Sequence, residues 1–145
     1  MLLGSNVCSV DGLGRIQLSD SFLGFIKTGV VMTQGFERNL LVMTADSFNE
    51  IVRQIAAMSQ TDPMVRLLSR ILLSNAQEVQ VSENKEFSIP EHLRKLCNLE
   101  QEAVVVGLGD YFEIWSQNAW EIQMNRIQDF DANANRFVSH NLVIH

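Results

Sequence analysis

Residues 10–19 read VDGLGRIQLS and place a tight turn between two short apolar segments. Asp11 can accept hydrogen bonds from nearby backbone N–H groups, as in an Asx turn. Gly12 and Gly14 can adopt a positive φ at little steric cost. The turn therefore holds Arg15 at its edge, where a guanidinium group can bind a phosphate or the edge of a guanine base.

A second stretch repeats this frame later in the chain. Residues 81–90 read VSENKEFSIP, again with apolar positions on both sides of a polar turn. The corresponding positions of the two halves are Val10 and Val81, Leu18 and Ile89, Phe22 and Leu93, Val30 and Val104, and Phe48 and Trp120. Each half is predicted to form a strand, a turn, a strand, a short helix and a β-hairpin. Because neither half alone offers much core, we expect the halves to interlock into one pseudo-symmetric barrel.

Apolar patterning places the remaining elements. Short strands are predicted at residues 6–10, 16–18, 30–33 and 40–43, and again at 79–81, 87–89, 103–106 and 112–115. Between the halves, apolar positions at helical spacing predict two helices that form an αα-hairpin, with Asp46 and Asp62 as their N-caps. Asn98 is expected to end a short helix in the left-handed conformation, and Ser116 to cap the helix that follows it. Residues 129–145 are polar with poor periodicity, which is typical of a frayed helix or of disorder.

The composition describes a chain that can bury a core. Of its 145 residues, 46% are hydrophobic and 19% are charged, which is typical of folded rather than disordered chains. The formal net charge of −6 argues against a broad basic surface of the kind that binds nucleic acid without sequence preference. A local site, at which a few arginines from several copies converge, stays possible.

The sequence shows no pattern typical of export or membrane insertion. No apolar run is long enough to span a membrane, so we expect no membrane partner. Residues 1–5 lack a basic segment followed by a long apolar one, so we expect no secretory signal. Cys8 and Cys97 are then expected to be reduced thiols in the cytoplasm.

The residues offer no constellation for catalysis. Gly107 and Gly109 lack the third glycine and the following helix of a dinucleotide site. The histidines have no partners at metal-ligand spacing, and no nucleophile can be paired with a base. We therefore expect no enzyme activity, no cofactor, no metal and no small-molecule substrate.

Several short segments follow one another over roughly residues 1–125. They are MLLG at 1–4, DGLGR at 11–15, VMTQG at 31–35, Arg66 and Arg70 ahead of Leu73, NL at 98–99, VVVG at 104–107 and EIWS at 113–116. By their order and spacing, these segments together resemble the MraZ family of bacterial transcription regulators.

The resemblance implies an α+β fold with a mainly β core. This fold would be a double-split β-barrel of two swapped-hairpin repeats of the AbrB type, with a central helical hairpin. The implied divisions are a first SpoVT-AbrB-like module at residues 5–47, a helical hairpin at 48–75, a second module at 76–119, and a C-terminal helix and tail at 120–145.

The resemblance also implies ring-shaped homo-oligomers that bind double-stranded DNA. The family reads short direct repeats upstream of the cell-division and cell-wall gene cluster, so the implied location is cytoplasmic and associated with the nucleoid. The alternative hypothesis is an oligomeric interaction protein on the same scaffold, with weakened or lost DNA binding. The acidic balance of the chain and the chemistry of its second turn motivate this alternative.

In the family each half carries an Asp-x-x-Gly-Arg turn that faces DNA, with a lysine before the glycine. Carried onto this chain, the DNA-binding residues are Asp11, Gly12, Leu13, Gly14, Arg15 and Lys85. The chain departs from the family pattern where Leu13 replaces the lysine, Ser19 replaces a proline, and Ser82, Lys85 and Glu86 replace the second aspartate, glycine and arginine. Glu86 would repel a nearby phosphate, whereas Lys85 could partly replace the lost positive charge.

The charged residues of both turns also have ordinary structural interpretations. Arg15 could form an ion pair with Asp11 that only closes the first turn. Lys85 and Glu86 could belong to a solvated turn without a ligand.

Two further sets of side chains allow more than one interpretation. Arg66 and Arg70 stand at helical spacing and could face either a partner subunit or solvent. Trp115 and Trp120 are expected to lie in the core and at its rim rather than to form a platform for a ligand.

Overall fold

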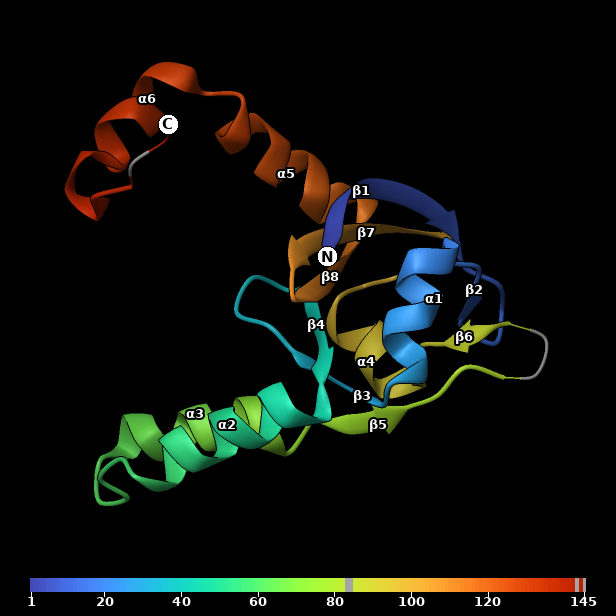
Figure 1. The fold of residues 1–145 in the computed structure, drawn as a ribbon, viewed down its shortest axis with the longest axis horizontal. Helices are drawn as coiled ribbons and strands as arrows, with labels where there is room; N and C mark the ends of the chain where they lie inside the picture. The colour runs from blue at the N-terminus through green and yellow to red at the C-terminus, as the bar shows by residue number, and fades with distance from the viewer. Residues whose placement is uncertain (83–84, 143, 145) are drawn as a thin grey trace.

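The computed structural model describes residues 1–82, 85–142 and 144 (Figure 1). Its strands are β1 (Leu2–Ser9), β2 (Arg15–Ile16), β3 (Val30–Gln34), β4 (Leu40–Thr44), β5 (Gln77–Val79), β6 (Phe87–Ser88), β7 (Glu102–Gly109) and β8 (Tyr111–Ser116). Its helices are α1 (Asp20–Lys27), α2 (Ala45–Ala56), α3 (Pro63–Leu73), α4 (Glu91–Leu96), α5 (Gln117–Ile127) and α6 (Phe130–Arg136), followed by a short 3-10 helix, η1 (Val138–His140). The expected α+β class with a mainly β core is confirmed.

The strand order shows how the two halves of the chain interlock. Within the described residues, one antiparallel sheet has the order β1-β7-β8-β4-β3-β5, and β2 pairs with β6 in a separate sheet. Each half supplies a hairpin, β3–β4 or β7–β8. The first strand of each half pairs with the hairpin of the other half, as β1 with β7 and β5 with β3. The predicted interlocking of the halves is therefore confirmed.

The six described strands of the large sheet do not close on themselves. Its outer strands, β1 and β5, stand at opposite ends of the strand order. The closed barrel expected from the repeat is thus not shown by the hydrogen-bond pattern. The short strands β2 and β6 are not part of this sheet, and they pair with each other in a separate ladder.

The core lies between the large sheet, the β2–β6 ladder and helices α1 and α4. Its largest fully buried side chains come from both halves and include Ile16, Ile26, Met32, Leu40, Phe87, Leu93, Phe112 and Ile114. The rings of Phe22 and Phe112 meet edge to face with centroids 5.2 Å apart, a favourable aromatic geometry. Fully burying each such side chain contributes about 1.5–3 kcal/mol, so the shared core holds the halves together.

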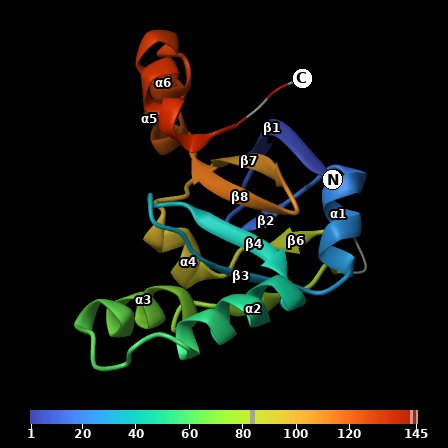
Figure 2. The same cartoon turned by 60° about the vertical axis from the view of Figure 1, so that its left-hand side comes forward.

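Helices cover the other face of the large sheet. Helices α2 and α3 lie side by side in both views, and α5 and α6 extend from the opposite end of the sheet (Figures 1 and 2). The hydroxyl of Thr33 on β3 donates a hydrogen bond to the Leu72 carbonyl of α3 at 2.5 Å. Trp115 is 3% exposed and packs against Trp120 of α5 with ring centroids 5.6 Å apart. The core and rim placement predicted for these tryptophans is confirmed.

The helix ends agree with the sequence at most capping positions. The Asp62 carboxylate accepts from the Met64 N–H, as expected for the cap of α3, and Asn98 has a φ of 55° after α4. Asp46 was expected to cap α2, and this prediction is wrong. Thr44 caps α2 instead, because its hydroxyl accepts from the Ser47 N–H at 3.1 Å.

The two ends of the chain are more ordered than their patterns indicate. Strand β1 begins at Leu2, whereas a strand was expected only from residue 6, because β1 lies along the full length of β7. The polar segment after Ile127 forms α6 and η1 within its described residues. Residues 83–84, at the centre of the second turn, and His145 lie outside the described residues.

The close approach of β1 to Gly107 on β7 generates a stability prediction. A Cβ at Gly107 would lie 2.6 Å from the Leu2 carbonyl carbon and 2.6 Å from the Leu3 backbone nitrogen. Gly107→Ala therefore forces β1 away from β7, and the free energy of unfolding should fall by roughly 1–3 kcal/mol. Urea titration followed by far-ultraviolet circular dichroism measures this loss.

The matched control adds the same methyl group where there is room for it. A Cβ at Gly24 in α1 would meet no atom within 4 Å. Gly24→Ala should raise the stability by about 0.5–1 kcal/mol, because alanine favours a helix over glycine. Equal free energies of unfolding for the two variants would contradict the close approach of β1 to Gly107.

Candidate nucleic-acid interface

The first turn, residues 11–15, is closed by hydrogen bonds that centre on Asp11. The Asp11 carboxylate oxygen Oδ1 accepts from the backbone N–H groups of Leu13 and Arg15, each at 2.9 Å. The Asp11 carbonyl accepts from the Gly14 N–H at 2.9 Å, and the Asp11 N–H donates to the Arg15 carbonyl at 3.2 Å. The Asx-type turn expected from the sequence is therefore confirmed.

Only one of the two glycines in this turn is required by its conformation. Gly14 has a φ of 77°, and a Cβ there would lie 2.6 Å from the Ile89 carbonyl oxygen. The Gly14 carbonyl also accepts from the Ile89 N–H at 2.9 Å, which ties the turn to the second half of the chain. Gly12 could also adopt a positive φ but does not, and a Cβ there would meet no atom within 4 Å.

Arg15 is held between two carboxylates. Its Nε donates to Oδ2 of Asp11 at 2.6 Å, and its Nη1 lies 3.5 Å from the Glu86 carboxylate. The hydrogen bond from the Arg15 backbone, together with that from its side chain, lowers the pKa of Asp11, and the same side-chain bond raises the pKa of Arg15. Both groups are therefore charged at neutral pH. The Arg15 side chain stays 44% exposed, so it is oriented yet accessible.

The second turn, residues 82–86, repeats three hydrogen bonds of the first turn with different side chains. The Ser82 N–H donates to the Glu86 carbonyl at 2.9 Å, and the Lys85 N–H donates to the Ser82 carbonyl at 3.0 Å. The Ser82 hydroxyl accepts from the Glu86 N–H at 3.2 Å, as the Asp11 carboxylate does in the first turn. Lys85 occupies the position of Gly14 with a φ of 61°, a conformation that strains a residue with a Cβ.

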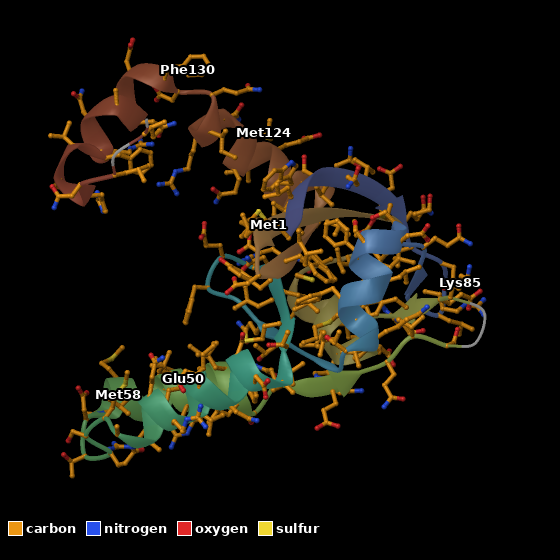
Figure 3. The ribbon with its side chains drawn as sticks, in the orientation of Figure 1. Met1, Glu50, Met58, Lys85, Met124 and Phe130 are labelled. Carbon is orange, nitrogen blue, oxygen red and sulfur yellow. The ribbon has the colours of Figure 1, made fainter. Side chains whose placement is uncertain are left out.

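The β2–β6 ladder brings the two turns to one side of the molecule. Ile16 pairs with Phe87 and Arg15 with Ser88, so the charged ends of both turns meet. Lys85 is exposed beside this ladder (Figure 3), and the Leu13 side chain is an exposed apolar group on the first turn, at 68%. Among the expected DNA-binding residues, the structure thus gathers the turn 11–15 and Lys85 on one surface.

Sequence reasoning missed one basic residue beneath this surface. The Arg94 Nη1 on α4 donates to the Ile89 carbonyl at 2.8 Å. The same atom would lie 1.6 Å from a Cβ at Gly14, which places Arg94 directly against the first turn. No spacing rule signals this contact, because it joins the two halves through the fold.

Arg66 on α3 bonds to residues close to it in the chain. The Arg66 Nη1 donates to the carbonyls of Gln60 and Thr61, both at 3.1 Å, and so closes the connection between α2 and α3.

No group of three His, Cys, Asp or Glu residues among the described positions could hold a metal ion. In the same part of the chain, no helix has the length and apolar character to span a membrane.

A groove on the opposite face is lined by apolar and acidic side chains. Its apolar lining includes Phe36, Leu41, Met43, Ile51 and Tyr111. The Glu113 carboxylate also lines this groove and accepts from the Asn39 Nδ2 at 2.8 Å and the Trp115 Nε1 at 3.0 Å. Burial raises the pKa of Glu113.

Comparison with known proteins identifies the family. The family described as "MraZ protein, putative antitoxin-like" matches residues 1–71 and again residues 72–140, in agreement with the internal repeat. A relative in Roseiflexus castenholzii, named Transcriptional regulator MraZ, is 33% identical over 137 residues, which cover 94% of each chain. Relatives of the same name in Herpetosiphon aurantiacus and Salinispora arenicola are 30% and 33% identical over 129 residues, which cover 89% of this chain and 90% and 91% of theirs.

The two matched ranges together span most of the sequence, and these relatives bear the name of a regulator, which is not an enzyme class. The chain belongs to the MraZ family.

Proposed function

We propose that this protein is a transcription regulator that binds duplex DNA through its first turn. The observation that carries the proposal is the geometry of Arg15, whose Nε is held by Asp11 while its side chain remains 44% exposed. Asp11 leaves the two terminal Nη groups as donors for a guanine edge or a phosphate, although Nη1 also lies 3.5 Å from Glu86. An orientation fixed in advance reduces the entropy lost on binding. The names of the relatives support regulation of transcription.

Multiple copies supply the affinity that one turn cannot. The chain carries a net charge of −6, and its first turn offers few phosphate contacts. We therefore propose a ring-shaped homo-oligomer in the cytoplasm, associated with the nucleoid, whose protomers read direct repeats upstream of the cell-division and cell-wall gene cluster. Engaging several repeats at once raises the affinity without new contacts within a protomer.

The groove on the face opposite the turns supports self-assembly. It presents a mainly apolar lining beside Phe36, which is 66% exposed. Large exposed apolar side chains beside a groove are typical of protein–protein contacts. A subunit contact at this groove leaves the turn surface accessible to DNA.

The mirrored strand order supports a finer description of the fold. We propose the double-split barrel of two SpoVT-AbrB-like modules, with residues 5–47 and 76–119 as the modules. Residues 48–75 then form the central helical hairpin, and residues 120–145 form the C-terminal helix and tail. The exchange of β1 and β5 between the hairpins is the arrangement that such swapped modules require.

A second candidate function is an oligomeric interaction protein that no longer binds DNA. The ion pair between Arg15 and Glu86 favours it, because it occupies a donor that DNA would use. Two carboxylates, from Asp11 and Glu86, lie next to one guanidinium group, so the local charge is not basic.

Arg15→Ala is the direct test of the proposed function. If the guanidinium contacts DNA, the variant should lose roughly ten- to hundredfold in affinity for a duplex from the region upstream of its own gene. Fluorescence anisotropy at several salt concentrations measures the affinity, and light scattering after size exclusion should give an unchanged oligomer mass.

The control for Arg15→Ala is Arg53→Ala. Arg53 also pairs with a carboxylate, that of Glu50, but on the outer helix α2. The control should bind as the wild type does. Wild-type affinity in Arg15→Ala would remove Arg15 from the mechanism, and no binding by the wild type even at low salt would favour the interaction protein.

Two substitutions of Lys85 separate its charge from its backbone. Lys85→Gln and Lys85→Gly both remove the charge, so both should weaken DNA binding slightly and make the salt dependence shallower, by about one in slope for a single phosphate. Only Lys85→Gly relieves the positive φ, and it should raise the free energy of unfolding by up to about 1 kcal/mol. Anisotropy titrations and urea denaturation test the two effects, and unaltered affinity in both variants would exclude Lys85 from the DNA interface.

A further inference from the structure

The two turns place opposite charges at equivalent positions of the repeat. Val10 and Leu18 of the first half correspond to Val81 and Ile89 of the second, which makes Glu86 the counterpart of Arg15. The hydrogen bonds of both turns support this correspondence, since Arg15 and Glu86 each accept at the carbonyl and donate at the N–H in the same pattern. The pseudo-symmetric ladder β2–β6 then brings the two side chains together.

The contact between Arg15 and Glu86 involves the guanidinium group that we propose binds DNA. The Nη1 of Arg15 lies 3.5 Å from a Glu86 carboxylate oxygen, and the Nε of the same guanidinium is already bound by Asp11. Glu86 therefore lies against the end of the side chain that Asp11 leaves available. A guanine edge or a phosphate that takes this end must displace the Glu86 carboxylate.

This contact has little value for folding. Arg15 and Glu86 have side chains that are 44% and 31% exposed, and exposed ion pairs contribute little to stability. The turn that carries Glu86 is closed by its own backbone and by Ser82, not by the ion pair. Removing the carboxylate therefore leaves both turns in place and changes only the competition for Arg15.

We propose that Glu86 is an intramolecular competitor that occupies Arg15 in place of DNA and so weakens DNA binding by the first turn. The inference rests on the proposed function, because it concerns the affinity of the same site. It adds a residue of the second turn to that site as a negative determinant. Every duplex that takes Arg15 pays the same free energy to displace Glu86, so removing the carboxylate strengthens each of them.

The test compares Glu86→Gln with the wild type on two duplexes. One duplex comes from the region upstream of the gene, and the other has the same base composition in scrambled order. Glu86→Gln keeps the shape of the side chain and removes its charge, so the affinity for both should rise, by roughly three- to tenfold. The upstream duplex should gain at least as much as the scrambled one, because releasing Arg15 helps a duplex in proportion to how strongly that duplex binds the guanidinium.

The matched control is Glu121→Gln. Glu121 is exposed on α5, and the substitution changes the net charge by the same amount. Met124 of the same helix lies on the far side of the molecule from Lys85 (Figure 3). An equal gain from Glu121→Gln would show that net charge alone explains the effect, and would overturn the inference.

A double variant tests whether Glu86 acts through Arg15. In an Arg15→Ala background the gain from Glu86→Gln should disappear, because there is no guanidinium to release. A gain of the same size in both backgrounds would mean that Glu86 only repels phosphates, and the competition would be wrong. Thermal unfolding should give similar midpoints for wild type and Glu86→Gln.

The outcomes separate this inference from the proposed function. If Arg15→Ala loses binding and Glu86→Gln matches the wild type, the function stands and the competition is overturned. If neither the wild type nor Glu86→Gln binds either duplex at low salt, both are overturned. If the wild type binds weakly and Glu86→Gln binds tightly only when Arg15 is present, both are supported.

Discussion

The pairing of Ile16 with Phe87 is the contact on which the candidate site depends. The two residues are 2% and 0% exposed and lie opposite each other in the short β2–β6 ladder. Each half contributes only one strand to this ladder, and an isolated pair of such short strands is not stable in water. The turns therefore acquire their geometry only when both halves have joined in the shared core. The candidate DNA-binding surface therefore forms only as the whole chain folds.

Backbone hydrogen bonds hold the shape of both turns and leave their side chains free to differ. A carboxylate at Asp11 and a hydroxyl at Ser82 accept the same N–H bond, so either side chain can close the turn. Gly14 and Lys85 share the left-handed conformation, although only the glycine does so without strain. A repeat can therefore exchange an arginine for a glutamate at its functional position without losing its fold.

The sequence predicted the elements of this fold better than their local details. Strands and helices follow from apolar spacing, and Asn98 and Asp62 act at helix ends as their side chains dictate. Asp46 was wrong as a cap because a threonine two positions earlier already accepts the same type of bond, and nothing in the pattern ranks the two. Of the two glycines that could adopt a positive φ in the first turn, only Gly14 does, because one such residue is enough for this turn.

The site was harder to predict than the fold, because its contacts cross between the halves. The Asp11–Arg15 pair is local in sequence and could be proposed from spacing alone. The contacts of Arg15 with Glu86 and of Arg94 with the first turn at Gly14 depend on how β2 meets β6 and how α4 lies under the first turn. Such contacts depend on the register in which β2 pairs with β6, and the sequence of two-residue strands is too short to predict that register.

The chain is acidic, whereas proteins that bind DNA are commonly basic. The charges at the two turns, which balance one another, explain how an acidic chain could still be a regulator. Arg15 and Lys85 bring two positive charges to this surface, and Asp11 and Glu86 bring two negative ones. Such a surface gains little from counterion release, which drives the binding of basic proteins to any DNA. Under the proposed function, its affinity for DNA must come from directed contacts by the oriented guanidinium and from repetition over several copies. A DNA-binding site of this composition would gain little from the phosphates of random DNA, so the bases that meet Arg15 would supply most of its affinity.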